Sequence, residues 1–84
     1  LEEIKNSSYN AKLYPNPALS SITLNLDGIA KADIEFLDIQ GKLIFSKNQV
    51  FNFDQIDISG ISTGTYFVRI ISEKGNQQIK VRVK

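Results

Sequence analysis

Few side chains in this sequence could carry out chemistry. The chain contains no His, which removes the usual general base at neutral pH, and no Cys, which removes the thiolate nucleophile. Paired carboxylates are the remaining route to acid–base catalysis. Asp33 and Glu35 share one face of a predicted strand, but that face points to solvent, whereas Asp54 and Asp57 fall on opposite faces of theirs. The sequence therefore predicts a protein that is not an enzyme and needs no cofactor.

Four aspartates near predicted turns could supply oxygen ligands to a hard cation: Asp27, Asp38, Asp54 and Asp57. A calcium loop places several carboxylates at alternate positions, and none of these turns has that dense spacing. A turn aspartate more often accepts a hydrogen bond from its own backbone. We therefore expect no metal site.

A basic strip stands near the end of the sequence, where cations alternate with valines. Lys80, Arg82 and Lys84 would share the outward face of one strand. They could protect an edge strand from aggregation, or they could form an electrostatic docking strip for a partner. The strip could extend to outward side chains of the preceding strand, Phe67, Arg69 and Ile71. A net charge of +1 and the lack of a stacking platform argue against nucleic-acid binding.

Short strands must position these side chains. From residue 21 onward, segments of alternating apolar and polar residues follow one another with turn signals between them. Eighty-four residues, 42% of them hydrophobic, suffice for one domain with a modest core. No apolar run approaches the length of a membrane span. We predict an all-β antiparallel sandwich of about seven strands. The residues expected to face inward are Ile22, Leu24, Leu26, Ile79, Val81 and Val83, and three further sets should each share one face of their strand: Ile34 with Phe36, Leu43 with Phe45, and Tyr66 with Val68 and Ile70.

The run Gly60–Ser72 organises this sandwich. A Gly/Ser/Thr turn leads into the densest β-forming segment of the chain. The spacing Ile61-x-x-Gly64-x-Tyr66 is similar to a tyrosine corner, in which the Tyr hydroxyl bonds to the backbone a few residues upstream. The alternative is that Tyr66 is an ordinary core aromatic.

The first residues differ in composition from the rest. Residues 1–12 are polar and have no sustained period, so we interpret them as a linker from something upstream and residues 13–84 as the domain. Pro15 and Pro17, with Asn16 between them, cannot donate ladder hydrogen bonds and should form a rigid corner that ends a short strand. Gly41 is expected at a turn position with positive φ.

Four segments together resemble a known family. They are Tyr14–Ala18, Asp38–Ile44, Ile61–Ile70 and Lys80–Lys84, and with the residues between them they cover about residues 13–84. In this order and spacing the chain resembles the C-terminal sorting domain, type A, of proteins exported by the type IX secretion system of Bacteroidetes. The resemblance implies an immunoglobulin-like fold of about seven strands.

The resemblance also implies a function. The domain would direct an upstream cargo from the periplasm through the outer-membrane type IX translocon to the medium or the cell surface. A sortase-like peptidase would then remove the tag, cutting before Leu13. The family's recognition elements map to Gly64, Tyr66, Lys80 and Lys84, with Arg82 inside the same basic run.

Two other functions remain open. An adhesion or carbohydrate-binding module would need exposed aromatic residues, and Tyr9, Phe51 and Phe53 are the candidates. A fibronectin-like structural spacer is the third hypothesis. A chain that ends so soon after its last strand argues against a spacer between domains.

Overall fold

The computed structural model describes residues 3–7, 9–15, 18 and 20–84. These residues form strands and turns, and alternation of side chains along each strand places one face of each sheet inward. The strands are β1 (Glu3–Ser7), β2 (Asn10–Tyr14), β3 (Ser21–Asp27), β4 (Lys31–Asp38), β5 (Leu43–Phe51), β6 (Gln55–Asp57), β7 (Gly64–Ser72) and β8 (Gly75–Val83).

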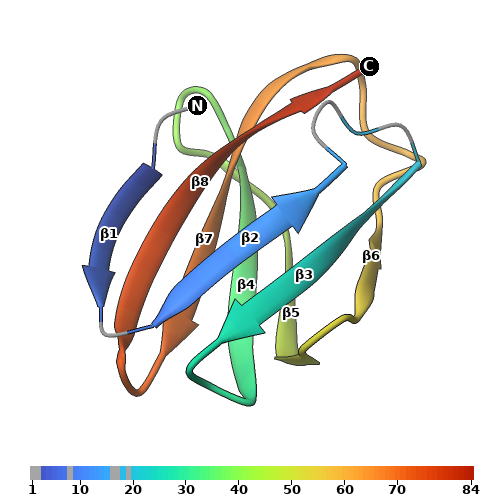
Figure 1. Cartoon of the computed structure of the whole chain (residues 1–84). Coiled ribbons are helices and arrows are strands. Elements are labelled where there is room, and N and C mark those ends of the chain that lie inside the picture. The colour runs from blue at the N-terminus through green and yellow to red at the C-terminus, as the bar shows by residue number, and fades with distance from the viewer. Residues whose placement is uncertain (1–2, 8, 16–17, 19) are drawn as a thin grey trace.

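The strands form two antiparallel sheets packed face to face. One sheet has the order β1-β8-β7-β4-β5, and the other has the order β2-β3-β6. Figure 1 shows the smaller sheet lying across the larger one, with the end of β8 and the end of β2 toward the same end of the sandwich. In immunoglobulin-like terms β6 and β7 occupy the places of strands E and F. The predicted β-sandwich is confirmed.

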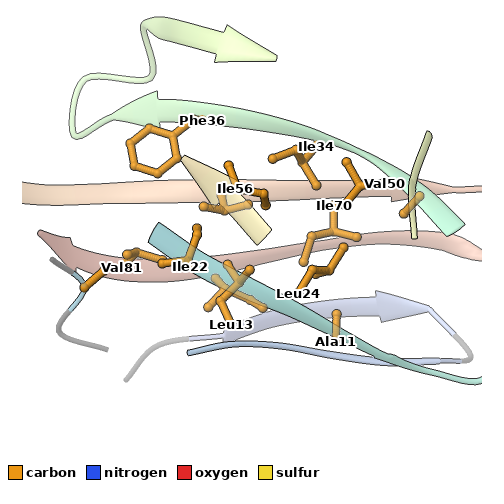
Figure 2. Packing of buried hydrophobic residues seen from close by; sticks show 14 of the residues in the cluster. Ala11, Leu13, Ile22, Leu24, Ile34, Phe36, Val50, Ile56, Ile70 and Val81 are labelled. Atoms are coloured by element: carbon orange, nitrogen blue, oxygen red, sulfur yellow. The ribbon is translucent and has the colours of Figure 1, made fainter. Parts of the chain in front are cut away.

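Apolar side chains from both sheets fill the space between them (Figure 2). Phe36 is fully buried, with its ring stacked on Phe45 at 5.0 Å and tilted against Tyr66 at 5.1 Å between ring centroids. Aromatic pairs of this kind contribute about 0.5–1.5 kcal/mol beyond the area they bury. The residues predicted to face inward on β3 and β8 are all buried, and so are the same-face sets of β4 and β7. On β5, Phe45 is half-buried against the core, whereas Leu43 is exposed.

Leu43 departs from the predicted pattern because of a β-bulge. Phe36 pairs with Phe45, whereas the next residue, Leu37, pairs with Leu43, so one extra residue of β5, Ile44, is accommodated. The bulge shifts the alternation by one position. Phe45 therefore packs on the core and Leu43 lies exposed, so the prediction that both share one side was wrong.

The predicted strands correspond to β2–β8, and β1 is an addition. Within residues 1–12, which we interpreted as a linker, β1 pairs with β8 and β2 begins at Asn10. Tyr9 and Ala11 are buried in the core. The segment has too few apolar positions to reveal a strand by pattern alone. Its role as a connection to an upstream cargo stays a prediction.

Candidate functional site

Tyr66 forms the predicted tyrosine corner. It is the third residue of β7, directly after the turn from β6, and its hydroxyl donates a hydrogen bond of 2.6 Å to the carbonyl oxygen of Ser62. The side chain is only 8% exposed, and its ring packs against Phe36. The hydroxyl is therefore committed to the fold and holds the turn before β7.

Gly64 lies under the ring of Tyr66, two residues along the same strand face. A Cβ at Gly64 would meet the Tyr66 ring at 3.6 Å, an ordinary contact distance. An aromatic ring lying over a strand glycine covers backbone that the missing side chain would leave open to water. Gly64 and Tyr66 therefore form one local packing unit at the start of β7.

The cations of β8 lie on the outward face, as predicted from alternation. Val81 and Val83 are buried in the core, while Arg82 and Lys84 are exposed and Lys80 is half-buried. The valines anchor the strand, so the cations are presented in a fixed row.

β8 is not an edge strand over its first half, but the cations lie beyond that half, so the interpretation that they protect an edge stays a prediction. β1 pairs with β8 from Gly75 to Ile79. Near the end of β8, Ala18 donates from its backbone N to Arg82 O at 2.7 Å and accepts from Lys84 N at 2.9 Å. Ala18 itself is completely buried. The chain after the proline corner thus holds the end of β8 in place.

Phe67 and Arg69 are the neighbours of the cationic row on β7. Phe67 pairs with Lys80, and Arg69 pairs with Gln78. The Arg69 guanidinium forms an ion pair with Glu35 of β4 at 2.9 Å. Arg69 is thus compensated by an adjacent strand, and the predicted extension of the basic strip to Arg69 adds no net charge there.

Of the other predicted structural positions, Pro15, Gly41 and Ile61 lie between strands. Pro15 follows the last residue of β2 and is joined to Tyr14 by a cis peptide bond, whereas Asn16 and Pro17 lie outside the described residues. Gly41 has φ +85°, which confirms the predicted left-handed position in the β4–β5 turn. Ile61 is partly buried against the core, and its N–H donates to Ile58 O at 3.0 Å.

Comparison with known proteins identifies the family. Residues 12–84 match the family described as "Secretion system C-terminal sorting domain". The chain belongs to this family of sorting domains. No curated protein and no solved structure gives a significant match. The assignment agrees with the type IX resemblance.

Sequence reasoning missed a polar link between the two sheets of the sorting domain. Gln77 of β8 is almost completely buried, and its amide accepts from Ala11 N at 3.2 Å and donates to Tyr9 O. The Tyr9 hydroxyl in turn donates toward Ile70 O at 3.3 Å and Gly75 O at 3.1 Å. Burial raises the pKa of Tyr9 above its ordinary value of 10.0, partly offset by a hydrogen bond with Ser72. The sequence did contain a signal for this burial, because Gln77 stands two residues before Ile79 and so falls on the inward face of β8.

Three of the turn aspartates accept hydrogen bonds from backbone N–H groups. Asp38 Oδ1 accepts from Gln40 N and Lys42 N, both at 2.9 Å, and Asp54 Oδ2 accepts from Phe51 N at 2.9 Å. Asp57 Oδ1 accepts from Ser59 N, and this backbone hydrogen bond, with one from the Ser59 side chain, lowers the pKa of Asp57. Within the described residues no three acidic side chains gather as a metal site would require.

Two further features have residues of the kinds that catalytic sites use, but both are structural. Gly60–Gly64 has the Gly-x-Ser-x-Gly spacing of a nucleophile elbow, but it joins two strands rather than a strand to a helix, and the Ser62 carbonyl accepts the Tyr66 hydroxyl. At the opposite end of the sandwich a cleft of about 770 Å³ includes Asp33 and Lys74 in its lining. Asp33 accepts from Gln49 N and so links β4 to β5, and Lys74 donates to Gly28 O in the turn before β4.

No helix in the described part of the sorting domain is long and apolar enough to cross a membrane.

Three aromatic residues were candidates for a carbohydrate-binding platform. Tyr9 is buried, which corrects its inclusion, whereas Phe51 and Phe53 are exposed around the turn before β6. Phe53 also has φ +69°, an uncommon backbone conformation for a bulky residue.

Proposed function

We propose that this sorting domain directs an upstream cargo protein across the outer membrane through the type IX translocon, and that the translocon recognises the outward row of β8. The family match supports secretion sorting as the general role. The observation that supports the row is its geometry: Lys80, Arg82 and Lys84 alternate with the buried valines on a strand that is fixed at its end by Ala18.

Rigid presentation favours recognition by charge. The backbone of an anchored strand needs no further ordering on binding, so only the side chains lose conformational freedom when an ion pair forms. Cations arranged in a row favour a partner surface with carboxylates, and such complementarity governs the association rate and the choice of partner more than the affinity.

Gly64 and Tyr66 have a supporting role in this proposal. The Tyr66 hydroxyl is bonded to Ser62 O and its ring covers Gly64, so neither residue offers a free polar group to a partner. Tyr66 pairs with Val81, and Gly64 pairs with Val83. We propose that the two residues act by setting the path of β7, against which the cationic half of β8 is laid.

We also propose that the tag is removed after export by a sortase-like peptidase acting before Leu13, as the family resemblance implies. The cargo would pass through the periplasm and reach the cell surface or the medium. β1 and Tyr9 lie in the segment preceding Leu13 and contact the sandwich. A peptidase would therefore have to separate this segment from the sandwich before cutting within it.

A second candidate function rests on the exposed Phe51 and Phe53. Exposed aromatic side chains can stack on sugar rings, so a carbohydrate-binding module is the alternative. Retention of the 84-residue chain on an immobilised polysaccharide, lost on Phe51→Ala or Phe53→Ala, would support this alternative over sorting.

The test of the sorting proposal is removal of the three charges without disturbing the core. Deleting residues 80–84 would also remove Val81 and Val83, which are buried, and could unfold the domain. The triple variant Lys80→Gln, Arg82→Gln and Lys84→Gln keeps both valines. Its matched control is Lys12→Gln, Lys31→Gln and Lys47→Gln, which removes the same charge from exposed positions elsewhere.

Each variant is fused to a cargo in a type IX-secreting bacterium, and the cargo is quantified in the medium, at the surface and in the periplasm. The β8 variant should accumulate in the periplasm with at least a tenfold fall in export, while the control is exported normally. Normal export of the β8 variant, with unchanged thermal stability of the purified domain, would contradict the proposed recognition row.

A further inference from the structure

The β4–β5 hairpin carries a cluster of exposed aliphatic side chains. Among the described residues, six large hydrophobic residues are exposed, and three of them lie at the turn end of this hairpin. Ile39 is 68% exposed in the turn, and Leu43 and Ile44 are 48% and 42% exposed at the start of β5. Single exposed aliphatic residues are ordinary, but a cluster marks a contact surface.

The cluster continues across the outer face of the five-stranded sheet. Leu37 lies outside the core cluster and yet is only 5% exposed. In the register of the sheet, Leu37 pairs with Leu43 on one side and with Phe67 on the other, and Phe67 pairs with Lys80. An apolar row therefore leads directly from the hairpin to the proposed cationic row.

The hairpin is held rigidly by its own hydrogen bonds. Asp38 Oδ1 accepts from Gln40 N and Lys42 N, Asp38 N donates to Lys42 O at 2.9 Å, and Gly41 N donates to Asp38 O at 3.0 Å. Ile39 sits in the turn between these bonded residues. Fixing apolar side chains before binding lowers the entropic cost of burying them in a partner.

The charges bordering this surface are mostly positive. Lys42 adjoins Leu43 in the chain, and Lys80 and Arg82 continue the border on β8. The carboxylates that lie near are engaged: Glu35 pairs with Arg69, and Asp38 accepts from its own turn. A complementary partner would present an apolar centre bordered by carboxylates.

We infer that the hairpin patch, defined as Ile39, Leu43 and Ile44 with Leu37 and Phe67 behind them, is a second contact surface of the sorting domain. Its occupant is a protein of the export machinery that has an apolar surface bordered by acidic side chains. The inference rests on the proposed sorting function and extends it, because one partner could cover the patch and the cationic row together. In such an interface the aliphatic centre would supply most of the affinity.

The test compares two ends of the molecule. Ile39→Ser, Leu43→Ser and Ile44→Ser together remove the patch, and Phe51→Ser with Phe53→Ser removes exposed apolar surface from the turn before β6 as a control. A single Ile39→Ser variant, in the most exposed position, replaces the triple variant if the latter lowers the melting temperature. Lys42→Glu tests the acidic border, with Lys42→Arg as its control.

Cargo fusions are assayed for export, and the purified 84-residue chains are assayed for binding to the detergent-purified type IX outer-membrane translocon at low and high salt. The patch variants should bind at least tenfold more weakly and be exported correspondingly less, while the Phe control and Lys42→Arg behave as wild type. Lys42→Glu should weaken binding most at low salt.

Three results would overturn the inference. Wild-type export of the patch variants, with export still lost in the β8 charge variant, would leave sorting intact and remove the patch from recognition. If wild type sediments as a dimer and the patch variant as a monomer with full export, the occupant is a second copy. If the β8 charge variant is also exported normally, the proposed function itself, recognition of the cationic row, is contradicted.

Discussion

Replacing Tyr66 by Phe isolates a single hydrogen bond. The ring remains, so its contact with Phe36 at 5.1 Å and its cover over Gly64 are retained, and only the hydroxyl bonded to Ser62 O at 2.6 Å is removed. A net hydrogen bond contributes about 0.5–1.5 kcal/mol, and a buried orphan acceptor costs about 1–3 kcal/mol. Ser62 is exposed, so water can reach its carbonyl, and we expect a loss of about 1–1.5 kcal/mol.

The loss is measured by urea unfolding followed by far-UV circular dichroism, because the chain has no Trp to report by fluorescence. For a domain of this size the melting temperature should fall by about 5–10 °C. Tyr14→Phe is the matched control, since the Tyr14 side chain is exposed, and it should change stability by less than about 0.5 kcal/mol. Equal stabilities of the two variants would show that the Tyr66 hydroxyl does not hold the corner.

Three further outcomes follow from the polar contacts. Gln77→Leu leaves Ala11 N and Tyr9 O without their buried partner, and urea unfolding should show a loss of about 2–4 kcal/mol; a neutral effect would show that packing alone joins the sheets. The raised pKa of Tyr9 means that its stabilising contribution is complete below pH 10 and is lost as the pH rises through the raised value, so Tyr9→Phe should weaken the decline in stability above pH 10 in parallel titrations. Arg69→Gln should cost under about 1 kcal/mol in the same unfolding assay, because its ion pair with Glu35 is largely open to solvent, and a larger loss would indicate a structural role.

Alternation of apolar residues predicted most of the sandwich. On β3, β7 and β8 the inward residues are those that the period of two selects, because both strand neighbours and the facing sheet constrain them. The tyrosine corner was predicted from spacing alone, since the distance from Tyr66 back to Ser62 is set by the turn.

The irregular parts of the fold could not be predicted from the alternation of apolar and polar residues. The bulge at Ile44 reverses the face of Leu43, and nothing in the local sequence distinguishes a bulge from regular pairing. β1 is fixed by pairing with β8, more than sixty residues away, and not by its own pattern. The hairpin patch was missed for the same reason, because its aliphatic residues come together only when β4, β5 and β7 are aligned.

The position of the cationic row was predictable, but its surroundings were not. Alternation alone placed Lys80 and Arg82 outward. The cover of β1 over the first half of β8 and the anchoring by Ala18 arise from chain segments distant in sequence. These contacts determine which part of β8 is available to a partner.

The most direct test of the central claim is whether the domain is sufficient for export. Residues 1–84 are fused to the C-terminus of a periplasmic reporter enzyme and expressed in a type IX-secreting bacterium and in its translocon-deficient mutant, and reporter activity is measured outside the cells. We predict that the reporter leaves the wild-type cells and remains in the periplasm of the mutant. Retention of a folded fusion in the periplasm of both strains would contradict the account.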